Sequence, residues 1–245
     1  MKKANVKELI ALVTGVGRRE GLGFAVCRDL AKAGHRVLLT ARHKKRGKAL
    51  ADELLQDGLP VEFLHLDVED RASLEDANAY LKKKYGKLDV LVNNAGGYYD
   101  FDKKASGISV DELEGALALN LRGAVNCCLT FIPLLRLSAS PRIVNVSSQV
   151  ASLSAPWGIR DGSNPSYAIS KAALNAFTFK LADDLRKEKF LVNAVCPGWI
   201  ATYPGMAEMG ARPVEKGSKS VLWACTLPAK GPTGGFYRDG SKLDW

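Results

Sequence analysis

Residues 9–33 read LIALVTGVGRREGLGFAVCRDLAKA, and this stretch indicates the fold class. It opens with an apolar run at 9–13, which has the length and composition of a buried strand. Four glycines follow between positions 15 and 23, and residues 24–33 then place apolar side chains at a helical period. Glycines let the backbone approach a phosphate closely, and a helix N-terminus offers free N–H groups and a positive dipole. A glycine loop between a first strand and a first helix therefore predicts a phosphate-binding loop rather than a plain turn.

The same alternation of short apolar runs and helical patterns continues along the chain. Strands that are nearly continuous in Val, Ile and Leu, with helices between them, indicate a parallel sheet covered on both faces. Right-handed crossovers then favour an α/β fold with a Rossmann-type, doubly wound parallel sheet. Further strands are expected at 36–40, 61–66, 88–92, 142–146, 190–195 and 235–237, and further helices at 44–56, 71–84, 111–135, 166–188 and 214–226.

The composition fits one globular domain. The chain has 245 residues, of which 47% are apolar and 25% charged, so wholesale disorder is excluded. We find no linker, low-complexity tract or repeat, and we expect residues 1–245 to form a single nucleotide-binding domain. No uncharged apolar run approaches the roughly 20 residues of a membrane span, so no membrane partner is expected.

The cysteines and the first residues bear on the cellular compartment. Five cysteines are an odd number, and they show neither a CxxC nor a His-paired spacing. This argues against a disulfide framework and against a metal site, and it favours reduced thiols in a cytoplasmic protein. The basic start leads directly into the strand and glycine loop, so we do not expect a signal peptide.

The net charge of +9 is concentrated near one end of the chain. The first 50 residues hold 13 Lys and Arg against 3 Asp and Glu, a net +10, whereas the other 195 residues hold 22 and 23. Dinucleotide folds often select NAD with an acid after the second strand, whereas an arginine there suits the 2′-phosphate of NADP. Here residues 40–46 read TARHKKR, and no acid follows until Asp52. Arg42, helped by Arg18 or Arg19, could hold that phosphate with a bidentate guanidinium, so we predict NADP(H) as the cofactor.

Two further strand ends carry residues that suit a nucleotide. Asp67 and Val68 follow the third expected strand, where an adenine ring would lie in such a fold. Asn94, Ala95 and Gly96 follow the fourth, and small residues with an amide suit a tight strand end beside a nucleotide. All of these are also common turn residues, so by themselves they do not establish a nucleotide-binding site.

Tyr167 and Lys171 form the pair that points to chemistry. Their spacing of four places both on one face of the helix expected at 166–188. A free tyrosine has a pKa of about 10, and a neighbouring ammonium group lowers it by favouring the phenolate. Tyr167 could then act as a general acid toward a carbonyl oxygen, or as a base in the reverse direction.

With these residues in order, the chain resembles the short-chain dehydrogenase/reductase family over essentially its whole length. The TAR element at 40–42 and the ending GPTGGFYRDGSKLDW are similar to the carbonyl-reductase-like, NADPH-preferring branch. The resemblance implies an enzyme that reduces a ketone or an aldehyde with NADPH. The matching motifs are TG(x)nGLG at 14–23, LDV at 66–68, NNAG at 93–96, LALNLRG at 117–123, IVNVSS at 143–148, YAISK at 167–171 and PGWIAT at 197–202.

The resemblance also implies a role for each matching residue. Tyr167 would be the catalytic acid/base, and Lys171 would tune it and bind the nicotinamide ribose. Ser148 would polarise the substrate carbonyl, and Asn120 would support a proton relay through water. No metal is implied. The cofactor would be bound by Gly15, Gly17, Arg18, Arg19, Gly21, Leu22, Arg42, Asp67, Val68, Asn94, Ala95, Gly96, Tyr167, Lys171, Pro197, Gly198, Ile200 and Thr202, the last near the carboxamide.

Two departures from the family pattern are visible. Five residues separate Gly15 from Gly21, where most members have three, so the resemblance does not assign the phosphate contacts within 16–20. Ser148 and Tyr167 lie 19 positions apart, which is longer than in most members. We expect the added stretch, within 153–165, to form a loop near the substrate mouth.

Three loops at 97–107, 151–165 and 199–212 are expected to surround the substrate, because ligands of open α/β sheets bind beyond the strand ends. Their large side chains favour an apolar or aromatic carbonyl or alcohol compound, with local packing as the other interpretation. Arg160 and Asp161 are expected in a solvated part of these loops, and Trp245 is expected to anchor the tail. The candidate walls are Tyr98, Tyr99, Trp157, Trp199, Tyr203 and Met206.

Three alternatives stay open. A 3-oxoacyl-carrier-protein reductase of the same family would use a basic surface to guide its acidic carrier. A non-catalytic NADP-sensing regulator is disfavoured by the intact catalytic set. A nucleic-acid-binding protein is suggested by charge alone, without a groove-reading motif, and we expect no nucleic acid partner. The family resemblance favours a homodimer or homotetramer through the helices at 111–135 and 166–188, and the sequence does not identify the natural substrate, the direction or the stereochemistry.

Overall fold

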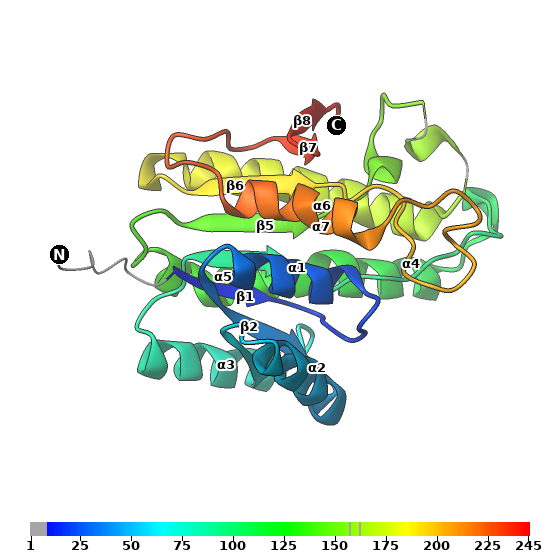
Figure 1. Ribbon diagram of the computed structural model, residues 1–245. Coiled ribbons are helices and arrows are strands. Elements are labelled where there is room, and N and C mark those ends of the chain that lie inside the picture. The colour runs from blue at the N-terminus through cyan, green and yellow to red at the C-terminus, as the bar shows by residue number, and fades with distance from the viewer. Residues whose placement is uncertain (1–8, 157, 162) are drawn as a thin grey trace.

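The computed structural model describes residues 9–156, 158–161 and 163–245, and a single sheet forms its centre (Figure 1). Among these residues the strand order is β3-β2-β1-β4-β5-β6-β7-β8. All neighbours pair in parallel except β7 and β8. The strands are β1 (Leu9–Val13), β2 (His35–Ala41), β3 (Val61–His65), β4 (Val90–Asn93), β5 (Arg142–Val146), β6 (Leu191–Val195), β7 (Phe236–Arg238) and β8 (Ser241–Leu243). The predicted Rossmann-type, doubly wound parallel sheet is confirmed.

Helices cover both faces of the sheet. One apolar cluster packs α1, α2 and α7 against one face, and a second packs α3, α5 and α6 against the other. Neighbouring residues of β1 alternate between the two clusters, with Ala11 and Val13 in the first and Ile10 and Leu12 in the second. Both faces of β1 are therefore buried, as its uninterrupted apolar run predicts. The helices are α1 (Leu22–Lys32), α2 (Lys44–Gln56), α3 (Arg71–Lys84), α4 (Val110–Leu117), α5 (Gly123–Leu135), α6 (Pro165–Asp184) and α7 (Val214–Cys225).

The helical stretch expected at 111–135 contains a change of geometry. A π-helical turn, Ala118–Arg122, joins α4 to α5 and carries the buried side chain of Asn120. Such turns are frequent at functional sites, because they redirect side chains without ending the helix. Short 3₁₀ segments at Ala105–Gly107, Gln149–Ala151, Ile159–Asp161 and Arg186–Glu188 complete the helical elements.

The same stretch, Val110–Leu135, is long and apolar enough to cross a membrane by length and composition alone. Its most apolar 18-residue window has a mean hydropathy of 1.4, and 44% of that window is buried inside the fold. Core helices of globular proteins pass the same test. In this fold Phe131 and Leu135 of α5 are fully buried in the cluster on the α3, α5 and α6 face.

The sequence pattern did not predict β8. It pairs antiparallel with β7, placing Phe236 opposite Leu243. Asp239 and Gly240 connect the two strands with φ of +52° and +80°, the backbone of a two-residue hairpin turn that favours Asp-Gly. Trp245 then stacks on Phe236 with ring centroids 5.7 Å apart, so it anchors the tail as expected.

The carboxyl ends of the parallel strands all open on one edge of the sheet, at the right of Figure 1. The loops that follow β1, β4, β5 and β6 gather there. The strand order reverses between β1 and β4, and ligands of open α/β sheets bind in the crevice outside such a point. The fold thus brings the predicted motifs to a single edge.

Candidate active site

Thr14 ties the end of β1 to the end of β4, where the strand order reverses. Its hydroxyl group accepts hydrogen bonds from the backbone N–H groups of Asn94 and Ala95, both at 3.0 Å. The Asn94 side chain donates in return to the Thr14 carbonyl at 2.8 Å. Gly15 follows with φ of +70°, and a Cβ on it would lie 2.5 Å from the Ala95 Cα, so this close approach requires glycine.

The start of α1 leaves hydrogen-bond donors open to an anion. Its N-cap residue, Gly21, has no side chain to cap the helix. The first-turn N–H groups, from Leu22 onward, can therefore serve an external acceptor at the positive end of the helix dipole. At Gly17, no atom lies within 4 Å of the position that a Cβ would take, so the loop is open there. This donor set fits a pyrophosphate, the group expected at the loop.

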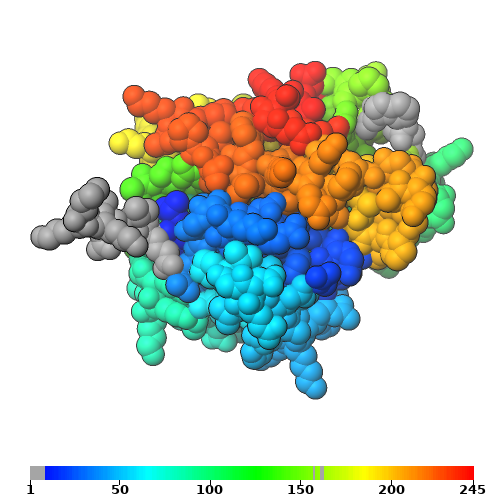
Figure 2. Space-filling view, in the orientation of Figure 1, coloured from blue at the N-terminus to red at the C-terminus, as the bar shows by residue number. Residues whose placement is uncertain are grey.

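The two arginines of this loop make different contacts. The Arg19 guanidinium pairs with the Glu53 carboxylate of α2 at 2.6 Å. The Arg18 guanidinium lies 3.7 Å from the centre of the Tyr203 ring and donates to the Thr202 carbonyl at 3.2 Å. Arg18 thus joins the first loop to the 199–212 loop, and Figure 2 shows the two loops side by side.

Arg42 follows directly after β2 and is exposed. The His65 ring contacts its backbone carbonyl at 3.2 Å, while its guanidinium has no hydrogen bond or ion pair to another described residue. A free guanidinium at this strand end fits the 2′-phosphate that the sequence assigns to it.

Asp67 and Val68 lie at the end of β3, in a segment fixed by neighbouring helices. The Asp67 N–H donates to the Ser73 hydroxyl at 2.9 Å, and the Asp67 carboxylate accepts from the Glu69 N–H at 3.1 Å. From α5, the Asn126 side chain donates to the Val68 carbonyl at 3.0 Å. The segment is therefore held at the same sheet edge as the glycine loop, beside which the adenine ring is expected.

Helix α6 presents Tyr167 and Lys171 on one face. The Lys171 Nζ lies 5.7 Å from the centre of the Tyr167 ring and donates to the Val146 carbonyl at the end of β5, at 2.8 Å. A Cβ on Gly96 would lie 3.1 Å from that Nζ and 2.9 Å from the Asn120 Oδ1. The helix, the end of β4 and the π-helical turn therefore converge on one point.

Asn120 holds the segment after β4 through its side-chain amide. Its Nδ2 donates to the Gly97 carbonyl at 2.9 Å and to the Ser170 hydroxyl at 3.0 Å. Its Oδ1 accepts from the Gly97 N–H at 3.0 Å. The amide is buried and fully engaged, so in this state Asn120 positions the Gly96–Gly97 backbone beside Lys171.

Burial governs the protonation of Tyr167 and Lys171. It raises the pKa of Tyr167 well above its usual value, a rise that the nearby Tyr99 and Cys196 reinforce and the hydrogen bond with Ser148 opposes. Burial also lowers the pKa of Lys171 to about 8. The Tyr167 hydroxyl therefore keeps its proton at neutral pH, as a general acid requires, and it has Ser148 as a hydrogen-bond neighbour.

Comparison with known proteins decides the family. The sequence profile described as short chain dehydrogenase matches residues 9–210. The chain belongs to this family. Among its relatives, (+)-neomenthol dehydrogenase of Arabidopsis thaliana is 35% identical, covering 93% of this chain and 95% of that protein. Carbonyl reductase [NADPH] 1 of Bos taurus is 30% identical, covering 96% and 98%.

Solved structures agree with this placement of the short-chain dehydrogenase. Salutaridine reductase from Papaver somniferum has a TM-score of 0.78 and 29% identity, covering 94% of this chain and 99% of that chain. A metagenomic short-chain oxidoreductase in complex with NADP has a TM-score of 0.75 and 26% identity, covering 94% and 95%. The predicted family and its carbonyl-reductase-like branch are confirmed, and the predicted cofactor agrees with the NADPH and NADP in these relatives' names.

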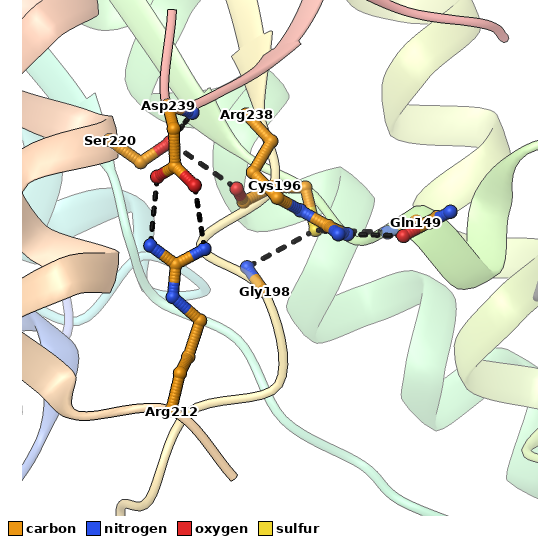
Figure 3. A network of polar contacts seen from close by, with 7 residues as sticks. All are labelled: Gln149, Cys196, Gly198, Arg212, Ser220, Arg238 and Asp239. Atoms are coloured by element: carbon orange, nitrogen blue, oxygen red, sulfur yellow. Dashed lines mark hydrogen bonds and ion pairs between the residues drawn. The ribbon is translucent and has the colours of Figure 1, made fainter. Parts of the chain in front are cut away.

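A polar network that the sequence pattern does not predict joins the segments after β5 and β6 to β7 in this short-chain dehydrogenase (Figure 3). The Cys196 sulfur accepts hydrogen bonds from the N–H groups of Gln149 and Gly198, at 3.2 and 3.4 Å. Arg238 of β7 donates to the same sulfur at 3.1 Å and to the Gln149 side chain. The network links the residue after Ser148 to the segment after β6, and the only sequence signal for it is the YRDG at 237–240.

Residues 197–202, expected to border the nicotinamide, run alongside a second segment. Ile200 forms an isolated parallel bridge with Arg212, whose carbonyl accepts from the Ala201 N–H at 2.9 Å. The Arg212 guanidinium makes two 2.8 Å bonds to the Asp239 carboxylate in the hairpin turn (Figure 3). Pro197 is buried, and Gly198, Ile200 and Thr202 are half-buried along the site's edge.

The loops predicted to surround the substrate expose aromatic rings. Tyr99, Trp199 and Tyr203 are each at least half exposed, with relative exposures of 56%, 50% and 56%. Met206 is half-buried and Arg160 exposed, while Trp157 lies outside the described residues. The lengthened loop is tied to the tail, because the Leu153 N–H donates to the Trp245 carbonyl at 2.9 Å.

Proposed function

We propose that this short-chain dehydrogenase catalyses the NADPH-dependent reduction of a ketone or an aldehyde, and the reverse oxidation of the alcohol. The observation that carries the proposal is the convergence of Tyr167, Lys171 and Asn120 beside a glycine loop that fits a pyrophosphate. The names of relatives, a neomenthol dehydrogenase and a carbonyl reductase, support the same class of reaction.

Two parts of the chain would hold the cofactor. The open N–H groups at the start of α1 would bind the pyrophosphate, and the free guanidinium of Arg42 would bind the 2′-phosphate. When bound, NADPH supplies the hydride that reduces the carbonyl carbon. The residues of the chain supply the proton and the orientation.

The proton for the carbonyl oxygen would come from Tyr167. Its hydroxyl is protonated at neutral pH because burial raises its pKa. Ser148, within hydrogen-bonding reach of that hydroxyl, would donate to the same carbonyl oxygen and polarise it. The Lys171 ammonium would stabilise the phenolate left behind. General acid catalysis of this kind contributes about 10²–10⁴-fold to a rate.

The exposed aromatic rings of the substrate loops favour a small, apolar or aromatic carbonyl compound or alcohol. A cytoplasmic location and the absence of nucleic acid and membrane partners remain proposals. So does a homodimer or homotetramer through α5 and α6, supported by the exposed side chains of Leu129 and Phe179 on these helices. Light scattering on the purified protein tests the oligomeric state.

NADPH absorbance measured with a carbonyl panel tests the proposal. The panel contains cyclohexanone, menthone, acetophenone, benzaldehyde, butan-2-one and an acetoacetyl thioester, and we expect turnover of at least one ketone or aldehyde. Turnover of the thioester alone would favour a 3-oxoacyl-carrier-protein reductase. NADPH binding without oxidation across the panel would refute catalysis and favour a regulator that senses NADP.

A further inference from the structure

The lengthened part of the glycine loop forms a turn. The Gly21 N–H donates to the Arg18 carbonyl at 3.2 Å, and Arg19 and Glu20 stand exposed between them. The Arg19 side chain pairs with Glu53 of α2, which follows β2. The Arg18 side chain contacts the segment after β6 instead. In the strand order β2 and β6 lie on opposite sides of β1, so the turn directs two neighbouring arginines to different parts of the fold.

Arg18 makes two contacts with the loop after β6. Its guanidinium lies 3.7 Å from the centre of the Tyr203 ring and donates to the Thr202 carbonyl at 3.2 Å. Arg18 is half-buried, whereas Tyr203 is exposed. A guanidinium over a tyrosine ring gains a cation–π attraction, which is stronger where water is partly excluded. One side chain of the glycine loop thus engages two successive residues of a loop that is distant in sequence.

The loop after β6 is closed at its base, and its outer part bonds to itself. At the base, Ile200 and Arg212 form an isolated parallel bridge. In the outer part, the Met206 N–H donates to the Tyr203 carbonyl at 3.3 Å, a bond within the loop. Arg18 therefore supplies a side-chain contact between this outer part and the glycine loop.

The strand order separates this contact from the expected site of the 2′-phosphate. Arg42 follows β2, whereas the segment that Arg18 contacts follows β6, four places away in the sheet. At about 4.8 Å between neighbouring strands, the ends of β2 and β6 lie about 19 Å apart. A guanidinium that contacts the segment after β6 is therefore not placed to share a phosphate with Arg42.

We propose that Arg18 is a positioning residue for the carbonyl substrate. It holds Thr202 and Tyr203 against the glycine loop, so the loop after β6 is ordered before the substrate binds and less freedom is lost on binding. It takes no part in selecting the 2′-phosphate. This inference rests on the proposed function, with Thr202 expected beside the nicotinamide and Tyr203 a candidate substrate wall. It also gives the lengthened glycine loop a use.

Cofactor affinity separates this role from phosphate binding. Arg18→Met removes the charge and the donors but keeps an unbranched side chain. The ratio of the NADH to the NADPH dissociation constant, measured by fluorescence quenching, should stay within about twofold of the wild type, because no phosphate contact is lost. Lys45→Met, which removes one exposed positive charge outside the loop, is the matched control. A ratio that falls further in Arg18→Met than in the control overturns the inference and makes Arg18 a ligand of the 2′-phosphate.

Limited proteolysis of the cofactor-free protein tests the hold on the loop. Chymotrypsin cleaves after aromatic residues, and Trp199 and Tyr203 are both exposed. Arg18→Met should raise the cleavage rate in this loop about 3–10-fold at an unchanged thermal midpoint, because the loop opens locally more often without the cation–π contact. Arg18→Lys keeps a cation for the ring and should restore part of the resistance. Mass spectrometry locates the cuts, and an unchanged rate in Arg18→Met overturns the inference.

Steady-state kinetics test the consequence for the substrate. With the best ketone of the panel, Arg18→Met should raise KM about 3–10-fold and change kcat by less than about twofold, because the proton donor is untouched. In a Tyr203→Leu background the same substitution should raise KM by about twofold or less, because the ring that Arg18 contacts is absent. An equal rise in both backgrounds overturns the inference.

Two of these measurements need no turnover. If the wild type oxidises no NADPH with any ketone or aldehyde, the proposed function fails. Cleavage of the loop and the ratio of the cofactor dissociation constants then decide whether Arg18 holds the loop. Faster cleavage of Arg18→Met at an unchanged ratio supports this role, and an unchanged cleavage rate or a lower ratio overturns it.

Discussion

At the residue scale, a single hydroxyl group would carry the proton of the reaction. The phenylalanine variant of Tyr167 keeps the aromatic ring and removes the hydroxyl group that carries this proton. We expect Tyr167→Phe to lower kcat at least about 100-fold, the usual contribution of a positioned general acid. The dissociation constant of NADPH, measured by fluorescence quenching, should change by less than about threefold.

The control for this prediction is Tyr80→Phe. Tyr80 lies on α3 and donates to Glu62, away from the convergence of Tyr167, Lys171 and Asn120. Its loss should leave both kcat and the NADPH affinity as in the wild type. Near wild-type turnover by Tyr167→Phe would assign the acid to another group.

The pH profile of reduction tests the other member of the pair. Burial lowers the pKa of Lys171 to about 8, whereas burial raises that of Tyr167. As the pH rises through about 8, Lys171 therefore loses its proton before Tyr167 does, and the positive charge that would stabilise the Tyr167 phenolate disappears. We expect kcat/KM for reduction to fall above about pH 8.

The substitution Lys171→Arg tests whether the alkaline limb of the pH profile reflects the loss of the Lys171 proton. Arginine keeps its charge far above pH 8, so the alkaline limb should move to higher pH, whatever the height of the profile. An alkaline limb that stays at the same pH would contradict the assignment to Lys171.

The lowered pKa of Lys171 also affects the pH dependence of the free energy of unfolding. Between about pH 8 and the ordinary value of 10.5, the unfolded chain binds the Lys171 proton more tightly, so this group makes stability rise with pH there.

At the scale of the elements, local signals predicted the fold well. Observed α2 and α3 match their predicted residues, because Gly58 adopts φ of +77° after the first and Asp70 caps the second through the Ala72 N–H. Observed β4 begins later than predicted, at Val90. Asp89, just before it, uses its carboxylate to accept from the Ile10 N–H at 2.8 Å, a long-range contact that apolar periodicity does not report.

The sequence predicted the site less completely than the fold, because several contacts of the site join segments that are far apart in the chain. The motif residues that converge were named in advance, since each stands at the end of a strand or on one helix face. The contacts of Asp100 with α6 and of Arg238 with Gln149 span 66 and 89 positions. They depend on the strand order, which brings distant segments together. Tyr99 was predicted as a candidate wall, but its contact with Tyr167 required the turn at Tyr98.

Arg238 offers a test of how one element supports another. It holds Gln149 and Cys196 from β7, and so fixes the backbone on either side of the catalytic edge (Figure 3). The substitution Arg238→Met should lower kcat about 3–10-fold with little change in KM for NADPH. It should also reduce the free energy of unfolding by about 1–3 kcal/mol, because it removes hydrogen bonds from a charged donor.

Lys242→Met is the matched control, because Lys242 is an exposed cation on the neighbouring strand β8. Urea unfolding measures the change in the free energy of unfolding, and steady-state kinetics measure kcat and the KM for NADPH. A variant Arg238→Met that loses stability but keeps its kcat would restrict Arg238 to a structural role. Arg238→Lys keeps the positive charge but lacks the planar guanidinium. Its kcat and its free energy of unfolding should lie between those of the wild type and those of Arg238→Met.

At the scale of the whole molecule, the net charge of +9 comes mainly from basic side chains in the first 50 residues. Within the described residues 9–50, the basic side chains lie in the glycine loop, on α1, on and just after β2, and at the start of α2. Part of this positive charge is balanced by ion pairs, since Arg19 pairs with Glu53 and Lys48 with Asp52. Arg42 is exposed at the strand end where a 2′-phosphate is expected. Arg42 is therefore the basic residue of this region that we expect to meet the cofactor's 2′-phosphate.

Cofactor-linked stability tests this interpretation on the intact protein. A ligand at 100 times its dissociation constant stabilises the folded state by about 2.7 kcal/mol. For a chain of this size that corresponds to a rise in the thermal midpoint of about 5–10 °C. At equal concentration NADH, which lacks the 2′-phosphate, should give a smaller rise. Arg42→Asp should abolish most of the NADPH shift and spare the NADH shift. Lys45→Asp makes the same change in net charge on an exposed neighbour, and an equal loss there would assign the preference to the general field instead of Arg42.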